Sequence, residues 1–189
     1  MNRRTISLAA ALALATTAPA IAQAVEDIQV TLSVQVSLPD ASITGLDDLS
    51  ISYDGAGAPT GTTTDQFCIY SPTQAFTLTL DGQNDSGGSF MLAPQAGSTS
   101  SIAYTIDIQD IINGTGSIGA FTPGAPVLVD IPDFAFETAC DEFGSNAEIG
   151  IAFPLEGPNS LDTVTASELS DGQLYVYTDV VTLTLAPQI

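Results

Sequence analysis

The chain has 189 residues, of which 22 are Asp or Glu, and its only basic residues are Arg3 and Arg4, since it has no His. This charge balance excludes nucleic-acid binding and attraction to anionic lipid surfaces, because both need Lys or Arg. It also excludes catalysis by Ser-His-Asp or Cys-His groups, His-ligated metals, and Lys-dependent phosphate loops or Schiff bases. An apolar content of 44% favours a folded domain over an acidic disordered tail, and the 13% of charged residues is well below the usual share of about 25%.

Residues 1–24 have the pattern of a cleaved signal peptide. Arg3 and Arg4 precede the apolar stretch 6–15, and residues 22–24 read Ala-Gln-Ala, a small-residue cleavage site. The alternative is an Ala-rich core helix. No later run of about 18 apolar residues follows, so we expect no membrane insertion of the mature chain. The sequence therefore predicts an exported protein.

Two cysteines remain, Cys68 and Cys140. In an oxidising compartment they are expected to form one disulfide that closes a loop of about 70 residues. The alternative, a reactive thiol, has no neighbouring cation to stabilise a thiolate.

Strand patterns fill nearly the whole mature sequence. Residues 28–38 alternate six apolar side chains with polar ones, which is the period of a half-buried strand. Gly and Pro residues separate the later segments, and no helical period follows position 25. Further strands are expected over residues 50–53, 66–70, 74–80, 89–92, 101–108, 126–131, 147–153 and 173–185. This spacing predicts an all-β sandwich. The expected parts are a signal peptide (1–24), an N-terminal strand or donor-strand extension (25–38) and a sandwich domain (39–189).

Acidic turn residues raise two catalytic possibilities, which we consider weak. Residues 85–87 read Asp-Ser-Gly, as in aspartic proteases, but that chemistry needs two such aspartates and only one copy exists. A hairpin tip is the preferred interpretation. A carboxylate pair for glycoside hydrolysis is a further possibility, but the chain has no Trp and few aromatic residues. We expect no enzymatic activity and no cofactor.

Calcium binding was considered at three groups of oxygen-bearing side chains. None of them has the spacing of a known calcium loop, so we expect solvated turn residues and no defined metal site. The groups are Asp81, Asn84, Asp85 and Ser86; Asp47 and Asp48; and Asp141 and Glu142.

The alternating strand 28–38 begins within four residues of the predicted mature terminus. It is either the first strand of the protein's own sandwich or a segment that completes a neighbour's sheet. An exposed alternating segment that docks through main-chain hydrogen bonds is the pattern of β-strand addition.

Several segments, in order and spacing, resemble bacterial fimbrial subunits of the chaperone–usher kind, near the spore coat protein U-like and archaic pilins. They are FCIYS (67–71), AFTLTL (75–80), SFML (89–92), IAYTI (102–106), Cys140 followed by NAEI (146–149), and the closing segment YTDVVTLTLAP (177–187). The opening segment VEDIQVTL (25–32) is similar to the donor segment of colonisation-factor fimbrins.

The resemblance implies an immunoglobulin-like sandwich that lacks one strand. A periplasmic chaperone would supply that strand first, and the next subunit's N-terminal extension would replace it at an outer-membrane usher. The donor residues would be Ile28, Val30, Leu32 and Val34, and the residues that border the acceptor groove would be Val181, Leu183 and Leu185. The implied function is a structural fimbrial subunit on the surface of a Gram-negative bacterium. The alternative is a self-complete secreted sandwich that binds a glycan or calcium.

Overall fold

The regular elements in the described part of the chain are β-strands, as expected from the alternating sequence. The computed structural model describes residues 26–36, 41–53, 60–61, 63–73, 75–95, 99–112, 114, 116–130, 144–154, 156–161, 163–164 and 175–188. The predicted signal peptide, Cys140, Asp141 and Glu142 lie outside these residues. The strands are β1 (Glu26–Val36), β2 (Ser42–Thr44), β3 (Leu49–Tyr53), β4 (Thr60–Gly61), β5 (Thr64–Tyr70), β6 (Ala75–Gly82), β7 (Phe90–Pro94), β8 (Ile102–Asp110), β9 (Gly116–Ala120), β10 (Val127–Asp130), β11 (Ala147–Ala152) and β12 (Val176–Pro187).

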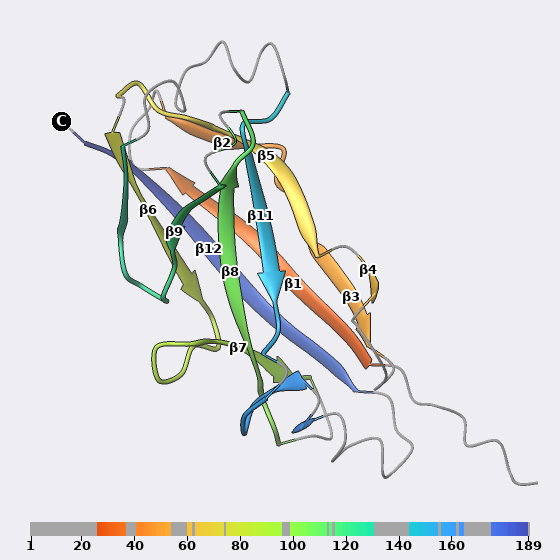
Figure 1. Ribbon diagram of the computed structural model, residues 1–189. Helices are drawn as coiled ribbons and strands as arrows, with labels where there is room; N and C mark the ends of the chain where they lie inside the picture. Colours follow the sequence, from red (N-terminus) through yellow and green to blue (C-terminus); the bar gives the residue numbers. More distant parts are fainter. Residues whose placement is uncertain are drawn as a thin grey trace, which may run out of the picture.

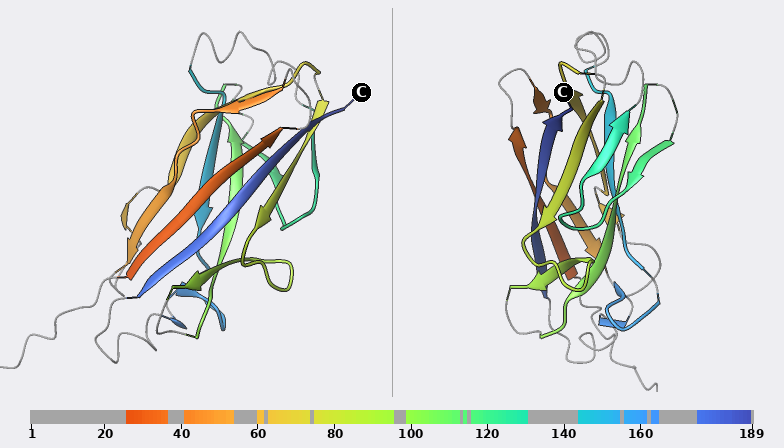
Figure 2. Two further views of the ribbon diagram at one scale, coloured as in Figure 1. Left: turned by 180° about the vertical axis from the view of Figure 1, so that it is seen from behind. Right: turned by 90° about the vertical axis from the view of Figure 1, so that its left-hand side faces the viewer.

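The strands form two layers (Figures 1 and 2). One layer contains β4, β3, β1, β12, β6 and β10 in that order of pairing, and the other contains β2, β5, β11, β8 and β9. Strand β7 pairs with β8 and with β12, so it joins the layers at one end. The all-β sandwich prediction is confirmed.

The core lies between the two layers and is formed by the side chains that point inward from each alternating strand. On β12 the side chains alternate between buried and half-buried without a break from Val176 to Pro187. The same rule holds on β6 and β8, where Leu78, Leu80, Ile102 and Ile108 are all fully buried. Period-two alternation therefore determines which face of each strand packs inward.

Strand boundaries differ from the sequence-based expectation where pairing overrides local turn signals. Residues 81 and 82 belong to an Asp-Gly sequence that predicts a turn, yet β6 continues to Gly82 because it pairs with Val181 of β12. Strands β2, β4 and β9 were not expected at all. They are short or rich in Gly, so no alternation can be recognised in them.

Candidate functional site

Strand β1 lies between β12 and β3 and is the candidate site of strand exchange. It pairs with β12 along ten residues, from Asp27 opposite Val176 to Val36 opposite Leu185. It pairs with β3 over Glu26–Val30 only. Figure 1 shows β1 and β12 running side by side along the length of the layer. The N-terminal strand thus occupies a position inside its own sheet.

The pairing of β1 with β12 is parallel, whereas every other strand pair of the described residues is antiparallel. Parallel ladders have slanted hydrogen bonds and are slightly less stable per residue than antiparallel ones. No short loop constrains β1 relative to β12, because they lie at opposite ends of the sequence. The parallel orientation is therefore determined by the contacts that β1 makes in the sheet and not by a connecting loop.

The four predicted donor residues lie on β1 but differ in how deeply they reach the core. Ile28 and Val30 are fully buried, Leu32 is half-buried, and Val34 is 38% exposed. Beyond Val30 the strand no longer pairs with β3. The amide of Leu32 instead donates a hydrogen bond to Asp48 Oδ1 at 3.2 Å. The first half of β1 is therefore held on both sides, and the second half is held mainly by β12.

The three predicted groove residues line the inner side of β12 next to this strand. Val181, Leu183 and Leu185 are completely buried. In the register of the pair, Val181 lies opposite Leu32 and Leu183 lies opposite Val34. The structure brings the two predicted sets together, while their roles in assembly stay predictions.

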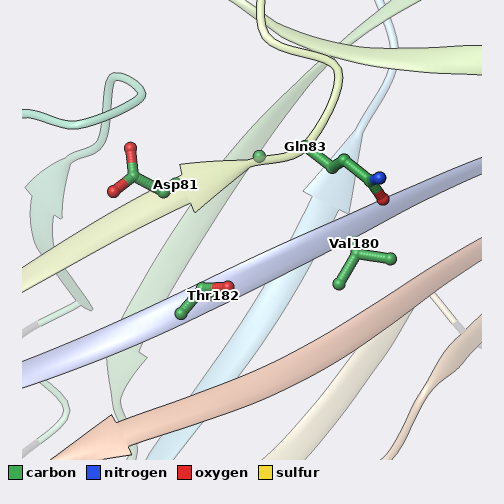
Figure 3. Close-up of a pocket in the computed structure, with 5 residues that line it drawn as sticks. Asp81, Gln83, Val180 and Thr182 are labelled. Carbon is green, nitrogen blue, oxygen red and sulfur yellow. The ribbon is translucent and has the colours of Figure 1, made fainter.

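The outer face of the sheet carries polar side chains on β1 and β12 and contains a shallow hollow between β12 and the end of β6 (Figure 3). Ser33 Oγ and Thr182 Oγ1 lie 2.8 Å apart across the β1–β12 pair and share a hydrogen bond. The hollow has a volume of about 320 Å³ and is lined by Asp81, Gly82, Gln83, Val180 and Thr182. Its lining offers hydroxyl, amide and carboxylate groups for hydrogen bonding.

A buried polar cluster on the inner side of β12 was not recognised as a unit in the sequence. Asp179 is 1% exposed and lies opposite Val30 of β1. Its Oδ2 accepts a 2.7 Å hydrogen bond from Tyr104 Oη, and its Oδ1 accepts bonds from the amide of Val180 and from both nitrogens of Asn84. The signal was available, because the alternation of β12 places Asp179 between Tyr177 and Val181 on the apolar face.

Burial governs the acidity of this cluster. It raises the pKa of Asp179, although hydrogen bonds from Tyr104 and from the amides of Val180, Asn84 and Gln83 act in the opposite direction. The pKa of Asp85 is also raised by burial; the bond from the Gly82 amide lowers it, and the charges of Asp179 and Asp81 raise it further. Burial, with the bond to Asp179, raises the pKa of the Tyr104 hydroxyl. Each group is thus favoured in its protonated form.

The predicted disulfide and the predicted acidic groups are the remaining candidate sites from the sequence. Cys68 is buried on β5 and is not a free thiol; its pairing with Cys140 stays a prediction, because Cys140 lies outside the described residues. The amide of Asp47 donates to Asp65 Oδ2 at 2.6 Å. Across the residues that the structure describes, no group of three or more Cys, His, Asp or Glu side chains converges as a metal site would require.

Comparisons with known proteins include a distant structural likeness. No family model and no curated protein matches the chain. A crystal structure of a mutant of CfaE, the CFA/I adhesin of enterotoxigenic E. coli, aligns with a TM-score of 0.35 and 9% sequence identity. The alignment covers 84% of this chain and 47% of the adhesin chain, so this chain spans about half the adhesin's length. No functional argument rests on this likeness.

The described part of the chain contains no helix long and apolar enough to cross a membrane.

Proposed function

We propose that this protein is a structural subunit of a bacterial surface fimbria, in which β1 leaves its own sheet and completes the sheet of a neighbouring subunit. The subunit is exported to the periplasm, held there by a chaperone and assembled at an outer-membrane usher. It reaches the cell surface of a Gram-negative bacterium as part of a fibre. It carries out no catalysis and needs no cofactor.

The position of β1 is the observation that carries this proposal. It is the first strand of the described residues, it lies inside the sheet, and its departure would expose Ile51 of β3 and the groove side of β12. Completely buried apolar residues such as Val181 and Leu183 would then face water, at a cost of about 1.5–3 kcal/mol for each side chain. A subunit without β1 therefore needs a replacement strand, either from a chaperone or from another subunit.

The direction of the strand also supports exchange. An incoming strand antiparallel to β12 would make the kind of ladder that the rest of the sheet uses, with slightly better hydrogen-bond geometry. Replacement of the parallel strand by an antiparallel one would thus make the backbone hydrogen bonds of the ladder slightly more stable. The same apolar face, Ile28 and Val30 first, would enter the groove.

A second candidate function is a self-complete secreted module that binds a glycan or calcium. The position of β1 in its own sheet favours this second function, because a monomer whose sheet is already complete needs no strand from a partner. The polar hollow of Figure 3 would then be the place to seek a ligand.

Deletion of residues 25–36 distinguishes the two functions. The mature chain and the deletion variant would each be produced in the periplasm with a chaperone of this pathway. We expect both to bind the chaperone, and only the mature chain to form fibres that survive SDS without boiling. A deletion variant that keeps the monomeric fold and the assembly state of the mature chain would contradict the proposal.

A further inference from the structure

The turn between β6 and β7 bonds to the carboxyl group of Asp179 on β12 through Asn84 and contains a second carboxyl group, that of Asp85, with one oxygen that lacks a hydrogen-bond donor. Asp85 Oδ2 accepts a 2.9 Å bond from the Gly82 amide. Asp85 Oδ1 is buried, and no donor contacts it. A buried acceptor without a partner is destabilising, so an ionised Asp85 would be poorly accommodated.

The unpartnered oxygen and one oxygen of the second carboxyl group both lie beside Gly82. A Cβ placed on Gly82 would contact Asp85 Oδ1 and would lie 2.8 Å from Asp179 Oδ2. These two oxygens therefore flank the same point, and only the absence of a side chain at residue 82 lets them do so. Two carboxylates this close repel each other when both are ionised.

The hydrogen bonds of Asp179 identify the oxygen that can accept one more donor. Its Oδ1 already accepts three N–H groups, from Val180 and Asn84. Its Oδ2 accepts the Tyr104 hydroxyl, and a carboxylate oxygen can accept more than one donor. A hydroxyl on Asp85 Oδ1 would supply that donor.

We propose that Asp85 and Asp179 hold one proton between them, carried on Asp85 Oδ1 and donated to Asp179 Oδ2, at a pH at which exposed aspartates are ionised. The proton fastens the turn 83–89 to β12, together with the bond from the Gln83 amide to the Val180 carbonyl. Asp179 lies on β12 opposite Val30, so the site is next to the place where β1 packs. It does not depend on the proposed fimbrial function.

The titratable groups around this proton are all acidic or neutral. Asp81 lies on β6, Asp85 in the turn, Tyr104 on β8 and Asp179 on β12. Beyond Arg4 the chain has no Lys, Arg or His that could compensate their charge. Because burial raises the pKa of both carboxyls, the folded chain binds the proton more tightly than the unfolded chain does. Stability from this proton is therefore complete in acid and is lost as the pH rises through the folded-state pKa.

Two measurements on the mature chain test the proposal. Carboxyl-carbon NMR of Asp85 and Asp179 should show a titration midpoint above the ordinary range of an exposed aspartate, with both signals responding to one event. Titration of Asp85 together with the exposed aspartates, as for an ionised carboxylate bridged by water, would overturn the proposal.

The second measurement compares urea unfolding at pH 5 and pH 8 for the parent chain, Asp85→Asn and the control Asp130→Asn. Asparagine keeps the shape of Asp85 and supplies an N–H donor that does not titrate. We expect Asp85→Asn to remove most of the loss in unfolding midpoint between the two pH values, and Asp130→Asn to keep it. Equal pH dependence in the two variants would overturn the proposal.

Discussion

Asn146 illustrates how one buried polar side chain can replace part of a strand. It is fully buried, its Oδ1 accepts a 2.8 Å bond from the Ile69 amide, and its Nδ2 donates to the Ile69 carbonyl at 2.7 Å. The side chain thus pairs both backbone groups of Ile69 as a neighbouring strand would. Its own amide and carbonyl bond to Phe67 and Ile111.

We expect Asn146→Ala to destabilise the fold by about 2–4 kcal/mol, because it removes both buried hydrogen bonds to the Ile69 backbone. Urea unfolding measures this change. The exposed Asn159 provides the control, and Asn159→Ala should stay within about 0.5 kcal/mol of the parent. A similar small effect for both variants would show that Asn146 has no such role.

Alternation predicts which single residues are buried, but not which residues of different strands lie close together. The inward positions of Val30 and Val181 follow from alternation alone, and the structure places both in the core. The position of Asp85 and Asp179 on either side of Gly82 could not be predicted in this way, because it depends on the β6–β12 register and on the absence of a side chain at Gly82.

At the scale of elements, alternation predicted most strands but not their partners. Strand β1 was expected over 28–38 and is observed at Glu26–Val36, and the last strand was expected over 173–185 and is observed at Val176–Pro187. Which strands pair is decided by contacts far apart in the sequence. The parallel orientation of β1 beside β12 therefore had no local signal.

Adjacent positions of β1 give a matched test of its inward face. Val30 is fully buried opposite Asp179, whereas its neighbour Gln29 is exposed. We expect Val30→Asp to abolish fibre formation, because a buried unpaired carboxylate beside Asp179 prevents docking of the strand. Gln29→Asp adds the same charge and should assemble like the parent. Sedimentation and SDS gels without boiling measure assembly, and fibres of normal yield from Val30→Asp would contradict the assigned donor face.

At the scale of the whole molecule, the carboxylates have no basic side chains to oppose them beyond residue 4. Their mutual repulsion is reduced only by dissolved ions. The Debye length falls from about 30 Å at 0.01 M to about 3 Å at 1 M salt, so added salt should screen most of it. Cohesion between subunits must likewise come from apolar burial and backbone hydrogen bonds.

We therefore expect the urea midpoint of the mature chain to rise with NaCl concentration at pH 8. Sodium sulfate at matched low ionic strength, where screening dominates, should have the same effect as NaCl. A midpoint that falls with added NaCl would show that repulsion among the carboxylates does not limit stability.

The central claim is that β1 moves from its own sheet to that of a neighbour, and a reversible lock tests it most directly. The Oγ atoms of Ser33 and Thr182 lie 2.8 Å apart, so a Ser33→Cys, Thr182→Cys variant can link β1 to β12 within one subunit. The measurement is the yield of SDS-resistant fibres from chaperone-bound subunits and usher, with each single variant as a control. We predict that subunits oxidised to form this link do not assemble, while the single variants, and the double variant after selective reduction, do. Equal assembly of the locked and unlocked subunits would contradict the claim.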